Sequence, residues 1–163
     1  MKPILTFALL LFSFSLFAHE EPPKTPWEVS KAEQKRLRIK EAGIREMIRW
    51  KWELKDGVPT GIKHKNLVYA YDRNGNLINL KLYEKDSLLQ EVRYVFNDKN
   101  QMIVDSDFDS NGNLTEMIVY AYGSEGYVRA GQKFDAQGKL IEKVAFTLSE
   151  GGTALSEVID DPD

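Results

Sequence analysis

The chain lacks cysteine altogether and has only two histidines among its 163 residues. Without cysteine it has no disulfide framework, no thiolate metal site and no cysteine to which a lipid anchor could be attached. After residue 18 it also lacks any apolar run of the roughly 20 residues that a membrane-spanning helix needs. Roughly 145 residues follow that position, which is enough for one hydrophobic core and too few for two ordinary domains.

Residues 1–18 are predicted to be an export signal. Lys2 precedes a mostly apolar run from Ile4 to Phe17, and Ala18 is the small residue after which cleavage is expected. The run is too short to span a bilayer comfortably. We therefore expect a periplasmic or secreted protein with no transmembrane segment after signal removal.

Charge is distributed unevenly along the chain, whose formal net charge is -3. Basic side chains outnumber acidic ones in residues 22–55, and acids are in excess in residues 56–163. Either the two parts neutralise each other, or the basic front contacts an anionic surface such as lipid headgroups. No nucleic acid is expected as a partner of an exported acidic protein.

The segment that follows the signal contains one predicted helix. Residues 19–25, HEEPPKT, are charged and contain two prolines, so a flexible leader is expected there. Thr25 as N-cap and Glu28 three residues later form a capping box, which predicts a helix over residues 26–43. Its apolar stripe is thin, so we expect the helix to lie on the surface.

A seven-residue motif marks the turns of a predicted sheet. YDRNGNL at 71–77 recurs as FDSNGNL at 108–114 and as FDAQGKL at 134–140. Asn-Gly favours the positive φ of two-residue turns between antiparallel strands, and the preceding Asp can accept hydrogen bonds from the turn backbone. Before the first motif, alternation predicts a strand over residues 44–54, and residues 55–65 are expected to form the longest loop.

The spacing between turns predicts which face the aromatic residues occupy. From the first apolar residue after each turn to the next aromatic the step is even, as from Leu77 to Tyr83, so all of them would share one face. Four aromatics are expected to be core on this basis: Tyr71, Phe96, Phe108 and Phe134. The predicted fold is all-β: a single antiparallel meander of about nine short strands over residues 44–159, built from hairpin repeats, twisted or partly curled, preceded by the one helix and followed by an acidic tail at 160–163.

The segment YAYDRNGNLINLKLY at 69–83 resembles the YD repeats of bacterial Rhs-type proteins, whose pattern is aromatic-x-Tyr-Asp-x-x-Gly-x-Leu. The resemblance covers roughly residues 66–148, is best at 69–77, and is poorest at 122–128, where Gly123 replaces the acid. Large Rhs proteins wind such repeats into a shell around a toxin, and this chain is far too short to enclose one. The resemblance therefore implies a short, stand-alone exported repeat protein and carries over only a sheet-building role.

No motif predicts catalysis or a cofactor. DSDFDSNGNLTE at 105–116 has the carboxylate spacing of a calcium loop, but Ser110 stands where that loop needs glycine and the flanks are predicted strands, so turn chemistry is the preferred interpretation. An amino-terminal His19 would bind copper only with a second imidazole, and His64 has no predicted neighbour that would place it. We expect no catalytic residue, no metal and no cofactor.

Aromatic side chains with a polar handle are the predicted binding residues. Trp52, Tyr94 and Tyr120 are expected to be exposed and to contact an unknown protein or saccharide ligand. The predicted function is that of an exported, non-enzymatic β-repeat protein that acts, as a monomer, as a binding or structural module in the cell envelope. Two alternatives stay open: an immunity or inhibitor-type partner of a toxin, and an enzyme that acts on a polymer laid along the sheet.

Overall fold

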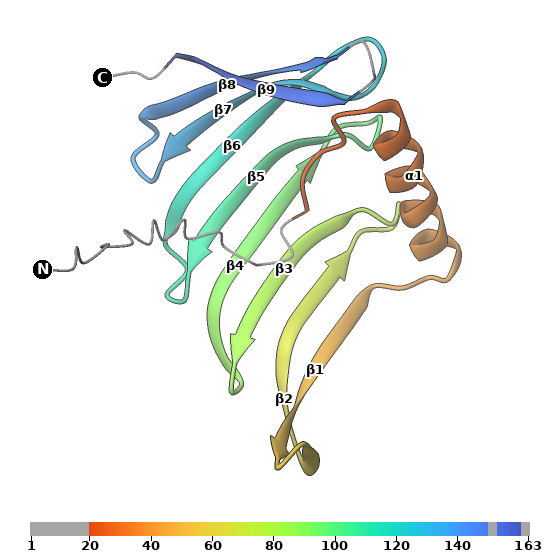
Figure 1. The fold of residues 1–163 in the computed structure, drawn as a ribbon, viewed down its shortest axis with the longest axis vertical. Helices are drawn as coiled ribbons and strands as arrows, with labels where there is room; N and C mark the ends of the chain where they lie inside the picture. The colour runs from red at the N-terminus through yellow and green to blue at the C-terminus, as the bar shows by residue number, and fades with distance from the viewer. Residues whose placement is uncertain (1–19, 150–152, 161–163) are drawn as a thin grey trace, which may run out of the picture.

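In the computed structural model, the described residues are 20–149 and 153–160, which form one helix and one antiparallel sheet of nine strands in sequential order (Figure 1). This confirms the predicted meander. The predicted signal at 1–18 and residues 161–163 of the predicted acidic tail lie outside the described residues. The elements are α1 (Pro26–Glu41), β1 (Glu46–Lys55), β2 (Val58–Tyr71), β3 (Leu77–Glu84), β4 (Ser87–Phe96), β5 (Met102–Asp109), β6 (Leu114–Tyr122), β7 (Val128–Asp135), β8 (Leu140–Leu148) and β9 (Ala154–Asp160).

Helix α1 begins at the predicted capping box. The Thr25 hydroxyl accepts a hydrogen bond from the Glu28 amide, and the Glu28 carboxylate accepts one from the Thr25 amide. The helix ends before Gly43, whose φ of +65° suits glycine. Figure 1 shows α1 lying across the ends of the strands, beside the β2–β3 and β4–β5 turns. Among the described residues, no helix combines the length and apolar character that crossing a bilayer requires.

The repeated motif forms turns, but of a different type from the one predicted. Gly75 has a φ of +87° and its amide donates to the Asp72 carbonyl, whereas Asn74 keeps a negative φ. This is a type I turn closed by a glycine in the left-handed region, and the Asp72 carboxylate accepts the amides of Asn74 and Asn76. The 109–113 turn repeats the arrangement. The expected two-residue turn is wrong here because three residues separate the paired positions.

Two-residue turns occur instead where no motif had predicted them. Asp56 and Gly57 have φ of 52° and 79° and join β1 directly to β2, so the expected long loop at 55–65 is wrong. Most of that segment is strand β2, which continues past a register shift near Gly61, where φ is +86°. The result is a long β1–β2 hairpin.

The predicted placement of all aromatics on one face is also wrong. In six successive pairings, β2–β3 to β7–β8, the register shifts by one residue beside the aromatic that precedes each turn, and an extra residue reverses the face on which later side chains lie. At the helix end of the sheet the aromatics share the inner face, defined as the face that carries the Leu80–Val92 pair. At the opposite end they share the outer face, which carries the Lys81–Glu91 pair. The inner set is Tyr71, Phe96 and Tyr122, and the outer set is Tyr83, Phe108 and Phe134.

The hydrophobic core lies on the inner face. Its buried members come from β2 to β5, and Ile39 of α1 packs against them. They are Leu67, Tyr71, Leu77, Leu80, Leu82, Val92, Tyr94 and Met102. Phe108 is not part of this cluster, because it lies on the outer face under the Arg93 guanidinium.

Residues 20–25, where a flexible leader was expected, contact the sheet. The Pro23 carbonyl accepts the Val128 amide at 2.9 Å, Pro22 is buried, and the Glu20 amide lies 3.3 Å from the Tyr94 hydroxyl. The segment therefore lies against the inner face over β4 and β7. Proline suits this position because a carbonyl acceptor is all that the contact with β7 requires.

Candidate functional site

Two of the three predicted binding aromatics belong to the interior. Tyr94 is 4% exposed, and its hydroxyl meets the leader at Glu20. The Tyr120 hydroxyl donates to Asp105 Oδ2 at 2.7 Å, and Asp105 itself is 2% exposed. Burial, reinforced by the Asp105 charge, raises the pKa of both tyrosines above their ordinary value. The predicted exposure is thus wrong for Tyr94, and Tyr120 is half-buried with its polar group already bonded to the protein.

The leader is the reason that sequence reasoning misplaced these tyrosines. Residues 20–25 occupy the inner face where an exposed aromatic platform was expected, and the Lys24 ammonium lies 5.3 Å from the centre of the Phe146 ring. Beneath the leader, the Asp105 carboxylate accepts the hydrogen bond of the Tyr120 hydroxyl. A hydrogen bond between two polar groups that are removed from water stabilises the fold.

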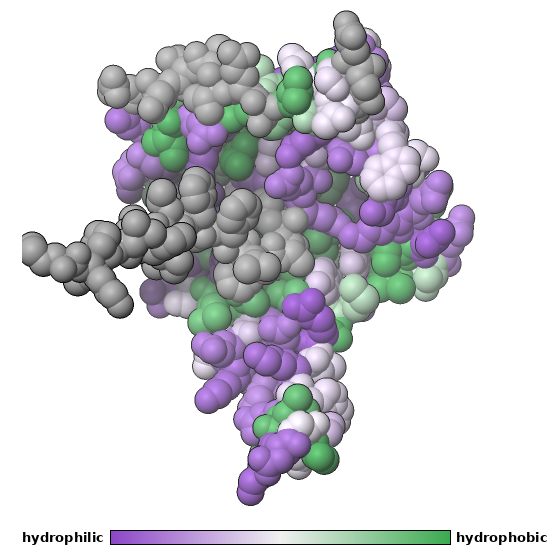
Figure 2. Space-filling model, in the orientation of Figure 1, coloured by the Kyte–Doolittle hydropathy of each residue, from purple (hydrophilic) through white to green (hydrophobic). Residues whose placement is uncertain are grey.

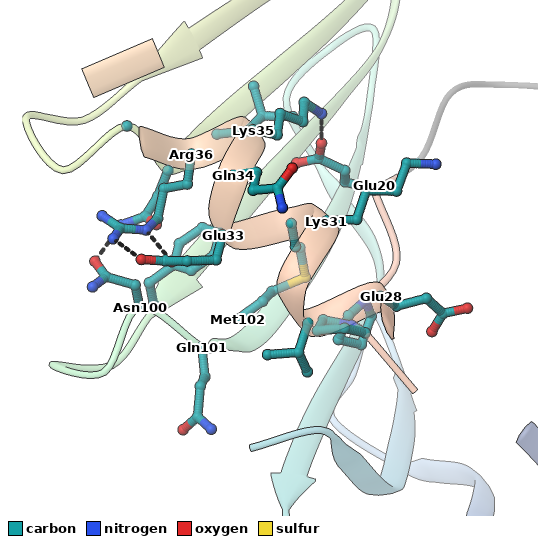
Figure 3. A pocket seen from close by; sticks show the side chains of 18 of the residues that line it. Glu20, Glu28, Lys31, Glu33, Gln34, Lys35, Arg36, Asn100, Gln101 and Met102 are labelled. Atoms are coloured by element: carbon teal, nitrogen blue, oxygen red, sulfur yellow. Dashed lines mark hydrogen bonds and ion pairs between the residues drawn. The ribbon is translucent and has the colours of Figure 1, made fainter. Parts of the chain in front are cut away.

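A groove runs between α1, the leader and the turns at the helix end of the sheet (Figure 3). It has a volume of about 990 Å³ and a mixed lining, with Met102 on its sheet side and the charged side chains of α1 along its rim. Arg36 binds Glu33 through two hydrogen bonds of 2.6 and 2.8 Å and donates to the Asn74 carbonyl at 2.7 Å. Lys35 pairs with Glu20.

These rim contacts fasten the helix to the sheet. The Arg36 hydrogen bond lowers the pKa of Glu33, so the pair is charged at neutral pH. Within residues 20–149 and 153–160, no group of three or more histidines or acids is arranged to hold a metal ion. The groove is best described as the helix–sheet junction, because Arg36 and Glu33, and Lys35 and Glu20, are engaged with one another along its rim.

His64 is held far more firmly than the sequence indicated. Its Nδ1 lies 2.9 Å from Asp86 Oδ2 and its Nε2 lies 2.9 Å from Glu53 Oε1. Asp86 also accepts the Lys65 amide at 2.8 Å. Hydrogen bonds to Asp86 and then to Glu53 raise the pKa of His64. Because both ring nitrogens are engaged by carboxylates, neither is placed to accept a proton from a nucleophile; the contact braces the β1–β2 hairpin against the β3–β4 turn.

The β1–β2 hairpin projects from the body and carries the remaining predicted site residue. Every residue of β1 is exposed, and four successive outer-face side chains are large and apolar. These are Ile48, Trp50, Trp52 and Leu54, with exposed fractions of 36%, 41%, 50% and 63%. Figure 2 shows the hairpin standing clear of the body, with apolar and hydrophilic residues side by side near its far end. The predicted exposure of Trp52 is confirmed.

Lysines of β2 lie over the aromatic rings of this surface. Lys63 Nζ is 4.5 Å from the Trp50 ring centre and 5.7 Å from that of Trp52, and Lys65 Nζ is 5.0 Å from that of Tyr83. Such cation–π contacts hold a cation beside an exposed ring. The outer face of the hairpin therefore combines flat apolar area with positive charge. The polar N–H of Trp52 predicted that this one residue is exposed. The alternation of apolar residues from Ile48 to Leu54 was the sequence signal for the whole stripe.

No family model matches the chain, and no curated protein matches it. A solved structure of a DUF3836 family protein from Bacteroides vulgatus ATCC 8482 is 14% identical, and the match covers 69% of this chain and 98% of that one with a TM-score of 0.25. A TM-score this low supports no conclusion about fold or function. The resemblance to YD repeats stays a prediction.

Proposed function

We propose that this chain is an exported, non-enzymatic binding or structural module of the cell envelope, periplasmic or secreted, that contacts its ligand through the β1–β2 hairpin. The observation that carries the proposal is the apolar stripe from Ile48 to Leu54, which projects on a strand whose residues are all exposed. Single exposed apolar residues are ordinary on protein surfaces, but a contiguous exposed stripe is typical of an interaction site.

Contacts at the base of the hairpin favour a binding role over a passive one. The His64 contacts to Glu53 and Asp86 connect β1, β2 and the β3–β4 turn, and they restrain the direction in which the stripe is presented. A preorganised surface loses less conformational entropy when it binds. Tryptophan, in addition, offers large contact area with few rotatable bonds and a single N–H donor, which suits protein or saccharide ligands.

Site-specific crosslinking in cells tests the proposal. A photoreactive phenylalanine analogue is placed at position 52 or, as a control, at position 95, because Trp52 and Val95 are both 50% exposed. We expect the protein in the envelope or medium, beginning at or near His19, and adducts at position 52 in clear excess over position 95. Retention of Met1 on a cytoplasmic protein, or equal adducts at the two positions, would contradict the proposal.

A further inference from the structure

We infer that the end of the hairpin binds the surface of an anionic lipid bilayer, an inference that rests on the proposed function and specifies its partner. The hairpin tip carries four apolar side chains that are among the most exposed of the sheet. Leu54, Val58 and Ile62 are 63%, 65% and 51% exposed, and Trp52 is 50% exposed. Together they form an apolar cap on a two-stranded ribbon that no other described element covers.

Basic side chains surround this apolar cap. Residues 49–65 contain five lysines and arginines against two acids, Glu53 and Asp56, and Glu53 is already bonded to His64. The basic residues are Arg49, Lys51, Lys55, Lys63 and Lys65. Lys55 and Asp56 lie at the turn beside the apolar side chains, and the other cations lie farther along the two strands. Exposed apolar side chains with an excess of positive charge around them complement a bilayer whose apolar interior lies beneath anionic headgroups.

Trp52 belongs to the apolar cap, and Trp50 lies two residues farther from the tip with Lys63 over its ring. Indole rings prefer the headgroup level of a membrane, where the ring is partly dehydrated and the N–H stays hydrogen-bonded. Trp50 and Trp52 share one face two residues apart, so when the ribbon approaches tip first Trp52 lies about 7 Å deeper than Trp50. The rest of the chain is acidic, since the whole carries a net charge of -3 despite this basic ribbon. Repulsion from an anionic surface therefore turns the body away and points the hairpin toward the membrane.

Two other binding partners could occupy this surface, and the experiment below distinguishes them from a lipid bilayer. Among the described residues no strand pairs with the outward edge of β1, so a second copy of the chain could pair there. A protein or saccharide could also cover the stripe. The basic side chains of residues 49–65 favour a lipid surface over a second copy, because two copies of the hairpin would bring like charges together.

Vesicle binding by the mature protein distinguishes these occupants. The protein is titrated with vesicles of phosphatidylcholine alone or mixed with phosphatidylglycerol, and tryptophan fluorescence is followed in a Trp27→Phe background, because Trp27 lies on α1 away from the hairpin. Binding is expected only with phosphatidylglycerol, with a blue shift, quenching by brominated acyl chains, and weakening at high salt. Replacing Lys51 or Lys55 by glutamine should weaken binding about five-fold each.

Matched apolar-to-polar variants test the role of the tip. Leu54→Asn combined with Val58→Thr should weaken vesicle binding by about ten-fold or more, since binding scales with the apolar area inserted. Val95→Thr, a change of the same kind on an exposed position of β4, should leave binding unchanged. Because these side chains are exposed, unchanged melting temperatures are expected and show that the fold is kept.

Three results would overturn the inference: no binding to phosphatidylglycerol vesicles, unchanged binding by the tip variant, or a dimer in sedimentation that the tip variant abolishes. Crosslinking at position 52 shows whether only the lipid partner is wrong or whether the proposed function of the hairpin is wrong as well. A protein or saccharide adduct without vesicle binding refutes the lipid partner alone, whereas absence of both refutes the hairpin as a binding site.

Discussion

Replacing Gly75 with alanine tests whether α1 is docked on the β2–β3 turn, and Gly112→Ala is its matched control. Both glycines close the same kind of turn, with φ of +87° and +83°. A β-carbon built on Gly75 would lie 2.2 Å from the Arg36 carbonyl oxygen and 3.0 Å from the Lys40 amide nitrogen. A β-carbon on Gly112 meets nothing within 4 Å.

Both substitutions therefore lose stability through backbone strain, and only Gly75→Ala loses more through a clash with the helix. Alanine in the left-handed region costs about 1–2 kcal/mol at either position. At Gly75 the obstructing atoms are helix backbone, which does not rotate aside as a side chain would, so α1 has to shift. That shift weakens the Arg36 bond to the turn and the packing of Ile39 against the core. Overpacking of this kind costs about 1–3 kcal/mol more.

Urea denaturation and hydrogen exchange measure the difference. The free energy of unfolding of Gly75→Ala should fall below that of Gly112→Ala by the additional cost, and amides of residues 26–41 should exchange faster only in Gly75→Ala. Gly138→Ala is a second control, because Gly138 has a φ of +80° and also meets nothing within 4 Å. Equal loss of stability in all three variants, with unchanged exchange in the helix, would refute the docking of α1 on this turn.

Two further predictions concern polar groups that the sequence left unplaced. Tyr120→Phe should lower the free energy of unfolding by about 1–3 kcal/mol, because buried Asp105 loses a donor; an unchanged urea midpoint would mean that the hydroxyl is not bonded in solution. His64 should titrate above its ordinary pKa of about 6.5 in an NMR experiment. Because the pKa of His64 is raised in the folded state, the stabilisation that protonated His64 gives the hairpin is complete below the unfolded pKa and is lost as pH rises through the folded pKa. Asp86→Asn removes one of the two carboxylate contacts and should lower the titration midpoint of His64. A midpoint that stays the same would contradict the contact.

Local signals explain why the order of elements could be predicted. The capping box at Thr25 and Glu28 and the turn at Gly112 each depend on residues within a few positions of one another; the capping box, and the position of the turn with its positive φ at Gly112, occur as expected. The alternation over residues 44–54 likewise predicted β1, and the polar N–H of Trp52 was the basis on which its exposure was predicted. The nine-strand meander follows from repetition of such signals, because neighbouring strands joined by short turns pair with each other.

The candidate site depended on contacts between distant parts of the chain. Tyr94 is buried where a leader 74 residues away crosses it, and His64 is placed by an aspartate that β3 separates from it in the sequence. No local pattern encodes either contact.

Composition and short-range spacing thus determined by themselves that this chain forms one cysteine-free antiparallel sheet with a capped helix and a basic front. Tertiary structure alone decided which aromatics are buried. One extra residue beside each turn reverses the alternation of a strand, so Phe96 faces the core while Phe108 lies outside beneath Arg93. The energy of burying a ring depends on the face it reaches, and that face is known only once the register of the paired strands is known.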